Sequence, residues 1–316
     1  MQVFRSLDEV PAEFGPTVVS VGNFDGVHLA HHEVVDHMAE RAHAIGGRAV
    51  VVTFEPHPLR ILRPDAAPRL LTPLHIKLKL LEATRIDAVL VLPFTRDLSM
   101  MSAHDFARDI LAGTLHAREV HEGYNFHFGH KAQGNVNTLG ALGEDLGFAV
   151  KIYPEKLLHG HHVSSSEIRK LIAEGRVRKA RKLLGRPFSI VSNPGRGRGY
   201  GRQYTVPTIN LARYDELVPG NGVYISHIRI NGECFDAVTN VGVRPTFGPD
   251  SFAIESHLLN FHPIELLAQT EVELFFLKRL RDEKKFESTD ALREQIGKDV
   301  AMAKRFLGLL KVGSRD

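Results

Sequence analysis

The feature that most constrains the fold is a change of hydrophobic pattern near residue 186. Before that point, apolar strand-like runs alternate with helical periodicity, as in Val18–Val21, then Val34–Ile45, then Ala49–Phe54. Strand–helix–strand units with nearly continuous apolar strands are typical of a parallel sheet buried on both faces. After that point, strand-like runs follow one another with little helix between them. The pattern predicts an α/β domain over 1–186 and a β-rich domain over 187–316.

Other segments of the first domain repeat this alternation. Ser102 followed by Asp105 predicts a capped helix start, because a serine hydroxyl can accept a hydrogen bond from the backbone N–H three residues later. The remaining expected helices cover 74–84, 166–174 and 177–184, and the remaining expected strands cover 88–92, 119–120 and 149–153.

The second domain has a strong hairpin signal. Asn231-Gly232 lies between the strand-like runs 223–230 and 233–241, and these two residues tolerate the positive φ angles of a type I′ turn. We expect further strands over 252–261 and 272–277. A final helix is expected over 289–310, with an apolar stripe of Leu292, Ile296, Val300, Ala303, Phe306 and Leu310.

Composition excludes several classes of function. A formal charge of +3 over 316 residues is too small to favour a nucleic-acid partner, and it suits small anionic ligands. The single cysteine, Cys234, excludes an internal disulfide framework. No apolar run approaches the length of a membrane span, and the N-terminus lacks the apolar core of a signal peptide. We therefore expect a cytoplasmic protein with no membrane partner.

The string from Gly22 to His31 is the most informative segment of the first domain. It follows an expected strand, contains glycines and opens an expected helix with two histidines, His28 and His31. Glycines let the backbone approach phosphates, and a helix N-terminus offers N–H groups to an anion. The histidines can donate to phosphate oxygens. They can also be half of a metal site or ordinary surface residues, in a chain with 18 histidines.

A second anion-binding candidate lies near the end of the same domain. Ser164, Ser165 and Ser166 start an expected helix, and Arg169 follows one turn later. This arrangement suits a triphosphate. The alternative is a serine cap followed by a solvated basic face.

In the second domain, glycine and arginine alternate over 195–202. The segment resembles RNA-binding Gly/Arg tracts, but a loop covering phosphates fits its position between strands better. Thr208 and Asn210 follow it, and in an extended segment both lie on one face as oxygen ligands suited to Mg²⁺. A structural turn is the alternative. Glu255, in an apolar strand, is either paired structurally or held in a cleft as a general base.

Several longer strings carry a family resemblance. The H-x-x-H pattern resembles the nucleotidylyltransferase superfamily, although Ala30 stands where that superfamily usually has glycine. The strings 22–28, 53–58, 123–129 and 164–169, together with 205–210, 219–224, 240–248 and 254–261, occur in order. Together they resemble the bacterial bifunctional riboflavin kinase/FAD synthetase family. The resemblance implies a Rossmann-like nucleotidylyltransferase domain, followed by a six-stranded antiparallel β-barrel kinase domain with a C-terminal helix.

The resemblance also implies site residues. In the first domain, His28 and His31 are the expected catalytic residues and hold ATP phosphates, and His57 is expected at the flavin. The expected phosphate-binding set there is Gly22, Phe24, Asp25, Asn125, Ser164, Ser165 and Arg169. In the second domain, Glu255 is the expected base, Thr208 and Asn210 the Mg²⁺ ligands, Gly201 a phosphate-binding residue and Arg244 a flavin-binding residue.

The implied activity is phosphorylation of riboflavin to FMN and adenylylation of FMN to FAD, with ATP and Mg²⁺ at both steps. The implied partners are riboflavin, FMN and ATP, with no nucleic acid, and a weak or transient homo-oligomer is compatible. One alternative keeps only the kinase, because Ala30 weakens the adenylyltransferase. Another is a non-catalytic flavin- or RNA-binding regulator that uses the Gly/Arg loop.

Overall fold

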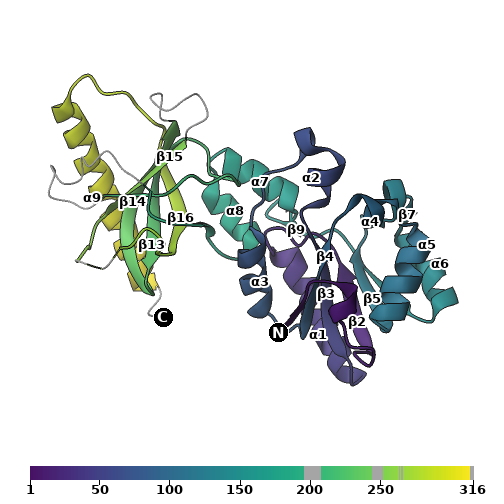
Figure 1. Cartoon of the computed structure of the whole chain (residues 1–316). Helices are drawn as coiled ribbons and strands as arrows, with labels where there is room; N and C mark the ends of the chain where they lie inside the picture. Colours follow the sequence, from purple (N-terminus) through teal and green to yellow (C-terminus); the bar gives the residue numbers. More distant parts are fainter. Residues whose placement is uncertain (196–207, 244–251, 263, 265, 314–316) are drawn as a thin grey trace. The chain divides into compact units, whose positions relative to one another are not determined.

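The structure is a computed structural model that describes residues 1–195, 208–243, 252–262, 264 and 266–313 (Figure 1). The chain forms two compact units, Met1–Ser165 and Ser166–Asp316.

The first unit is built on a parallel sheet with strand order β1-β4-β3-β2-β5-β8. Its strands are β1 (Gln2–Phe4), β2 (Thr17–Val21), β3 (Arg48–Glu55), β4 (Ala88–Pro93), β5 (Ala117–Gly123) and β8 (Ala149–Tyr153). Its helices are α1 (Leu29–Ala44), α2 (Pro58–Leu62), α3 (Leu74–Glu82), α4 (Arg96–Met100), α5 (Ala103–Asp105), the π-helical η3 (Phe106–Thr114) and α6 (Val136–Leu146). Short pieces complete it: η1 (Leu7–Glu9), η2 (Pro64–Ala66), β6 (His127–Phe128), η4 (His130–Ala132), β7 (Gly134–Asn135), β9 (Leu157–Leu158) and β10 (His161–His162).

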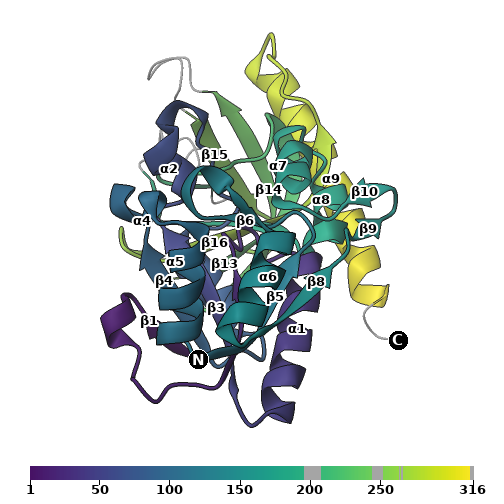
Figure 2. The same ribbon diagram turned by 90° about the vertical axis from the view of Figure 1, so that its right-hand side faces the viewer.

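Helices cover both faces of this sheet (Figure 2), as the apolar strands predict. On one face, Val18 packs with Met38 of α1 and Leu81 of α3. On the other, Val19 packs with Ile110 of η3 and Leu139 of α6. Because successive strand residues point to opposite faces, β2 contributes to both cores. The expected Rossmann-like arrangement is confirmed. The edge strand β1 and helix α6 were missed at the sequence level.

The pairing between β2 and β5 stops short of the carboxyl ends of the two strands. The ladder ends at Val19 opposite Val120, whereas β2 pairs with β3 as far as Val21. The Val21 N–H donates instead to Oε1 of Glu122, at 2.6 Å. Glu122 is 3% exposed. Its carboxyl group therefore takes the place of a backbone acceptor at the centre of the sheet.

Helices α7 (Ser165–Ala173) and α8 (Val177–Leu184) precede the strands of the second unit. These strands form an antiparallel sheet with order β11-β16-β13-β14-β15-β12. Their bounds are β11 (Phe188–Ser192), β12 (Thr208–Asn210), β13 (Gly222–Ile230), β14 (Glu233–Val243), β15 (Phe252–Leu258) and β16 (Val272–Arg281), and α9 (Thr289–Gly313) follows.

The two edge strands of this sheet meet just beyond their ends. Pro194 and Leu211 form an isolated antiparallel bridge. The Gly195 N–H donates to the Asn210 carbonyl and the Ala212 N–H to the Asn193 carbonyl, both at 2.8 Å. These bonds join the β11 side to the β12 side, so the sheet curls into the expected barrel. The hairpin is also confirmed, because Asn231 and Gly232 have φ of 49° and 84°.

The expected apolar stripe of α9 is partly wrong. Ala303 and Leu307 pack against Val223 and Leu277 of the sheet, and the partly buried Val300 and Phe306 join them. In contrast, Leu292, Ile296 and Leu310 are 38–40% exposed. The apolar residues toward the two ends of the helix therefore lie outside the packed segment. An ion pair of Arg281 with the buried Asp299 fixes the helix instead, at 2.8 Å.

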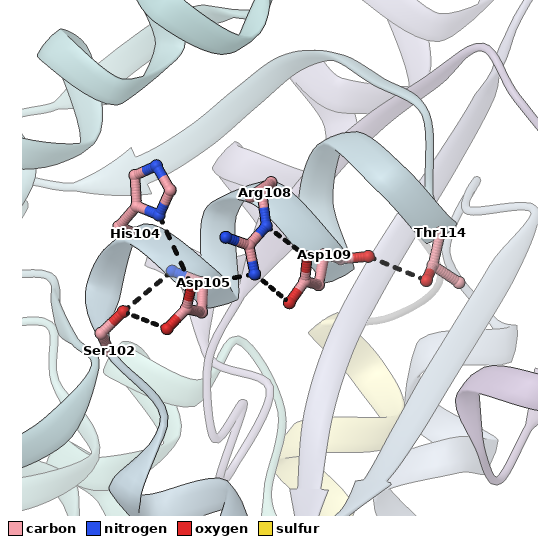
Figure 3. Close-up of polar contacts among 6 residues, drawn as sticks. All are labelled: Ser102, His104, Asp105, Arg108, Asp109 and Thr114. Carbon is pink, nitrogen blue, oxygen red and sulfur yellow. Dashed lines mark hydrogen bonds and ion pairs between the residues drawn. The ribbon is translucent and has the colours of Figure 1, made fainter.

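The capping pair at Ser102 predicts a local stability effect. Its hydroxyl accepts from the Asp105 N–H at 3.0 Å and donates to the Asp105 carboxylate at 2.7 Å (Figure 3). Ser102→Ala should lower the free energy of unfolding of the first unit by about 1 kcal/mol. Urea unfolding followed by circular dichroism measures this loss. Ser99→Ala removes a hydroxyl that donates to the Arg96 carbonyl within α4, so it serves as a control and should have a smaller effect.

Glu122 predicts a pH-dependent contribution to stability. Burial raises the pKa of its carboxyl group well above the ordinary value, and the hydrogen bond from Val21 only partly offsets this. Because the folded pKa exceeds the unfolded one, the stabilising contribution is complete at low pH and is lost as pH rises toward the folded pKa. Glutamine cannot ionise. The free energy of unfolding of Glu122→Gln, measured by thermal or urea unfolding, should therefore increase relative to that of the wild type between pH 5 and pH 9. Parallel curves for the two proteins would contradict this.

Candidate active sites

The carboxyl edge of the parallel sheet gathers the predicted residues of the first unit. The Gly22–His31 turn follows β2, His57 follows β3, and Asn125 follows β5. Because β3, β2 and β5 are adjacent and parallel, their carboxyl ends share one edge. From β2 the chain continues to β3 on one side, and from β5 it continues toward β8 on the other. The position between β2 and β5 at this edge is therefore the topological switch point, which is where ligands bind in open α/β sheets.

A buried carboxylate fixes the turn after β2. Asp25 is 2% exposed and accepts hydrogen bonds from the Leu71 and Thr72 N–H groups, each at 3.0 Å. The Gly26 N–H donates to the Thr72 hydroxyl at 3.0 Å. The Ser165 hydroxyl donates to the Asp25 carbonyl at 2.8 Å, which brings that predicted residue to the turn. The Asp25 side chain thus has a structural function that its motif does not reveal.

The two histidines cap the start of α1 reciprocally. The His31 N–H donates to Nδ1 of His28 at 3.4 Å, and the His28 N–H donates to Nδ1 of His31 at 3.3 Å. Their rings stack with centroids 3.6 Å apart, and Phe24 contacts the His31 ring at 4.8 Å. Since both Nδ1 atoms accept, this network assigns the proton of each neutral ring to Nε2. Each Nε2–H is the type of donor that a phosphate oxygen requires.

The remaining predicted residues of this half differ in exposure. His57 is 8% exposed and its Nδ1 accepts from the Leu59 N–H at 3.2 Å, so it caps α2. Asn125 is exposed in the loop after β5, and Gly22 is half-buried directly after β2. Ser164 is half-buried immediately before α7. Arg169, on α7, belongs to the second compact unit.

A buried lysine, Lys77, lies beside this turn and was not among the residues predicted from the sequence. Lys77 of α3 is 5% exposed, and its Nζ donates to the Thr53 hydroxyl at 3.2 Å. That hydroxyl donates to the Asn23 carbonyl at 3.2 Å. Burial lowers the pKa of Lys77, while the charges of Asp25 and Glu55 act in the opposite direction. A lysine on a helix resembles a solvated residue in the sequence, so only tertiary structure reveals its burial.

The predicted residues of the second unit lie on neighbouring strands. Glu255 of β15 is directly opposite Asn210 of β12 and, on its other side, Asn240 of β14. Directly opposed residues point to the same face with Cβ atoms roughly 5 Å apart. The three polar side chains therefore form a row across three strands. Asn240 was not among the predicted site residues, and strand register is the information that identifies it.

A second row lies two residues along the same face. His257 is opposite Thr208 and, on its other side, Val238, which packs against α9. Burial lowers the pKa of His257 and so favours its neutral ring. Thr208 and Asn210 therefore share a face with Glu255, as the extended segment predicts.

Buried hydroxyls on the opposite face hold β15 in register. Thr239 contacts Ser226 at 2.6 Å and Ser256 at 2.9 Å, and all three are 0% exposed. Since Ser256 follows Glu255 directly, this chain of hydrogen bonds fixes the strand that carries the predicted base.

The oxygen groups on this face fit a hard cation. A hydroxyl, an amide oxygen and a carboxylate are the ligand types that Mg²⁺ accepts. Over the described residues, no group of three or more His, Cys, Asp or Glu side chains is arranged to hold a metal ion. A site of the predicted kind would thus depend on Thr208 and Asn210. Gly201, Arg244 and most of the Gly/Arg loop lie outside the described residues.

None of the helices in the described ranges is long and apolar enough to cross a membrane.

Two family models match the chain in succession. The FAD synthetase model matches residues 10–167, and the riboflavin kinase model matches residues 184–307. A crystal structure described as a macrolide-efflux protein from Streptococcus pneumoniae superposes with a TM-score of 0.86 at 25% identity, covering 96% of this chain and 98% of its own.

Curated relatives match over nearly the whole chain. The bifunctional riboflavin kinase/FMN adenylyltransferase of Pseudomonas fluorescens is 35% identical over 96% of this chain and 97% of its own. The protein of the same name from Escherichia coli K12 is 32% identical, covering 97% of each chain. The order of the two family models agrees with the order of the two expected domains along the sequence. The chain therefore belongs to the bifunctional riboflavin kinase/FMN adenylyltransferase family.

Proposed function

We propose that the two activities of this family are divided between residues 1–186, which adenylylate FMN to FAD, and residues 187–316, which phosphorylate riboflavin to FMN. ATP is the donor in both reactions. The observation that carries the proposal is the placement of two separate sets of polar groups, one at the switch point of the parallel sheet and one on the β12–β15–β14 face.

In adenylyl transfer, an oxygen of the FMN phosphate attacks the α-phosphorus of ATP, and pyrophosphate leaves. The capped histidines His28 and His31 donate to phosphate oxygens, assisted by N–H groups at the start of α1. Gly22, Phe24 and Asp25 shape the turn, and Asn125, Ser164, Ser165 and Arg169 complete the phosphate contacts. His57 lies on the flavin side. Positioning and charge stabilisation are sufficient, because no covalent enzyme intermediate is needed.

In the kinase reaction, the ribityl 5′-hydroxyl of riboflavin attacks the γ-phosphorus of ATP, and ADP leaves. Glu255 accepts the hydroxyl proton. Thr208 and Asn210 would hold Mg²⁺. Gly201 and Arg244, which lie outside the described residues, are assigned to the phosphates and the flavin respectively. Bound Mg²⁺ would offset the negative charge of the transferred phosphoryl group. The direct opposition of Asn210 and Glu255 supports this assignment, because it places a ligand and a base side by side.

We also propose that the protein acts in the cytoplasm without nucleic-acid or membrane partners, and that any self-association is weak. The small net charge and the single, exposed Cys234 support this.

Glu255→Ala should reduce FMN formation from riboflavin by roughly 100-fold or more, because general bases contribute on that scale. FAD formation from supplied FMN should remain. Chromatography of flavins after incubation with ATP and Mg²⁺ measures both reactions. Glu233→Ala, which removes an exposed carboxylate of the same domain, is the control and should retain both. Loss of both activities in folded Glu255→Ala would be incompatible with separate sites.

His31→Ala should reduce FAD formation roughly 100-fold, because it removes a phosphate donor and half of the reciprocal cap. Kinase activity should be retained. The matched control is His43→Ala, which alters an exposed histidine in the last turn of the same helix. Unchanged FAD output would disprove the assignment. If the wild type accumulates FMN without FAD, Ala30 has left only the kinase.

A further inference from the structure

Glu122 is a buried acid at the switch point that the proposed mechanism does not use. It is buried one residue before the end of β5, and alternation along the strand places it on the same face of the sheet as Val120, which packs with residues of η3 and α6. Within the described part of the chain, its carboxyl group accepts one hydrogen bond, from the Val21 N–H at 2.6 Å. Burying a carboxyl group at the centre of a sheet is unfavourable unless it satisfies a polar group there.

The hydrogen bond lies where the two central strands part. A continued parallel ladder would direct the Val21 N–H to a backbone carbonyl of β5 and hold the strands about 4.8 Å apart. The ladder instead ends at Val19 and Val120. A side-chain acceptor reaches further than a backbone carbonyl. The Val21 N–H is therefore satisfied without closing the strands together.

This parting adjoins both phosphate-binding segments. The turn that carries His28 and His31 starts at Gly22, directly after Val21. The loop with Asn125 starts just after Gly123, one residue beyond Glu122. On its other side, Gly22 is held to β3 by its N–H, which donates to the Val52 carbonyl at 2.9 Å. The start of the turn is thus fixed from both neighbouring strands, by backbone on one side and by Glu122 on the other.

We propose that Glu122 is a positioning residue for adenylyl transfer: by accepting the Val21 N–H where the β2–β5 ladder ends, it keeps the strands parted and sets the Gly22 turn for the nucleotide phosphates. This inference rests on the proposed function of the first unit. Glu122 does not contact the reacting atoms. It acts through the backbone that carries the phosphate donors.

The test compares three variants of the full chain. Glu122→Gln retains a carbonyl oxygen that can accept the hydrogen bond. Glu122→Met keeps the side-chain volume but has no acceptor, and Glu122→Ala removes both the volume and the acceptor. For Met and Ala, kcat/KM for FAD formation should fall roughly 10- to 100-fold, as expected for misplaced phosphates. Gln should restore it to within about threefold of the wild type. Riboflavin kinase activity of each protein should stay unchanged and reports that the rest of the chain is intact.

Thr17→Val is the matched control for loss of stability. The Thr17 hydroxyl is equally buried and donates to the Leu115 carbonyl at 2.7 Å, which links β2 to the residues before β5 at the opposite, amino end. This variant should lower the melting temperature and leave kcat/KM for FAD formation unchanged.

Three results would overturn the inference. The first is unchanged kcat/KM for FAD formation in the soluble Glu122→Met or Glu122→Ala variant. The second is a loss of kcat/KM in Glu122→Gln as large as in those variants. The third is a loss of the same size in Thr17→Val at the same change in melting temperature. Either the Met or the Ala variant is sufficient if the other does not fold. Absence of FAD formation by the wild type would instead contradict the proposed function itself.

Discussion

Parallel strands place all of their carboxyl ends at one edge, and the first site depends on this constraint. The turn with His28 and His31, the cap at His57 and the loop with Asn125 come from distant parts of the sequence. They meet because β3, β2 and β5 are adjacent. The switch point lies between β2 and β5, whose following segments lead to opposite sides of the sheet. There the β2–β5 ladder ends, and the Glu122 carboxyl group accepts the Val21 N–H in place of a backbone carbonyl. The hydrogen bonds that Asp25 accepts then fix the turn at this edge.

The second site depends on register rather than on strand direction. Antiparallel pairing brings Asn210, Glu255 and Asn240 into one row, and a buried chain of hydroxyls behind them fixes that register. A shift of one residue would turn Glu255 to the other face. The barrel interior thus stabilises the geometry of the face that carries the polar groups.

Much of this was predictable from local patterns. The apolar strands β2, β3 and β4, the starts of α3, α8 and α9 and the Asn231-Gly232 turn follow from periodicity and turn chemistry. The histidine pair at the start of α1 could be singled out because its signal is local. The function of Glu122, the burial of Lys77 and the position of Asn240 beside Glu255 could not be found in this way. Each depends on which strands become neighbours, and that information is absent from any short segment. The α9 stripe failed for the same reason, because periodicity identifies an apolar face but not how much of it is covered.

Two independent sites in one chain can be tested most directly by complementation. Glu255→Ala and His31→Ala proteins are incubated with riboflavin, ATP and Mg²⁺, separately and mixed, and the flavins are resolved by chromatography. We expect at most roughly one hundredth of the wild-type FAD from either protein alone and far more from the mixture, because FMN made by the His31→Ala protein reaches the intact first unit of the Glu255→Ala protein. FAD from the mixture no greater than that from the separate proteins, or wild-type FAD output from either variant alone, would contradict the account.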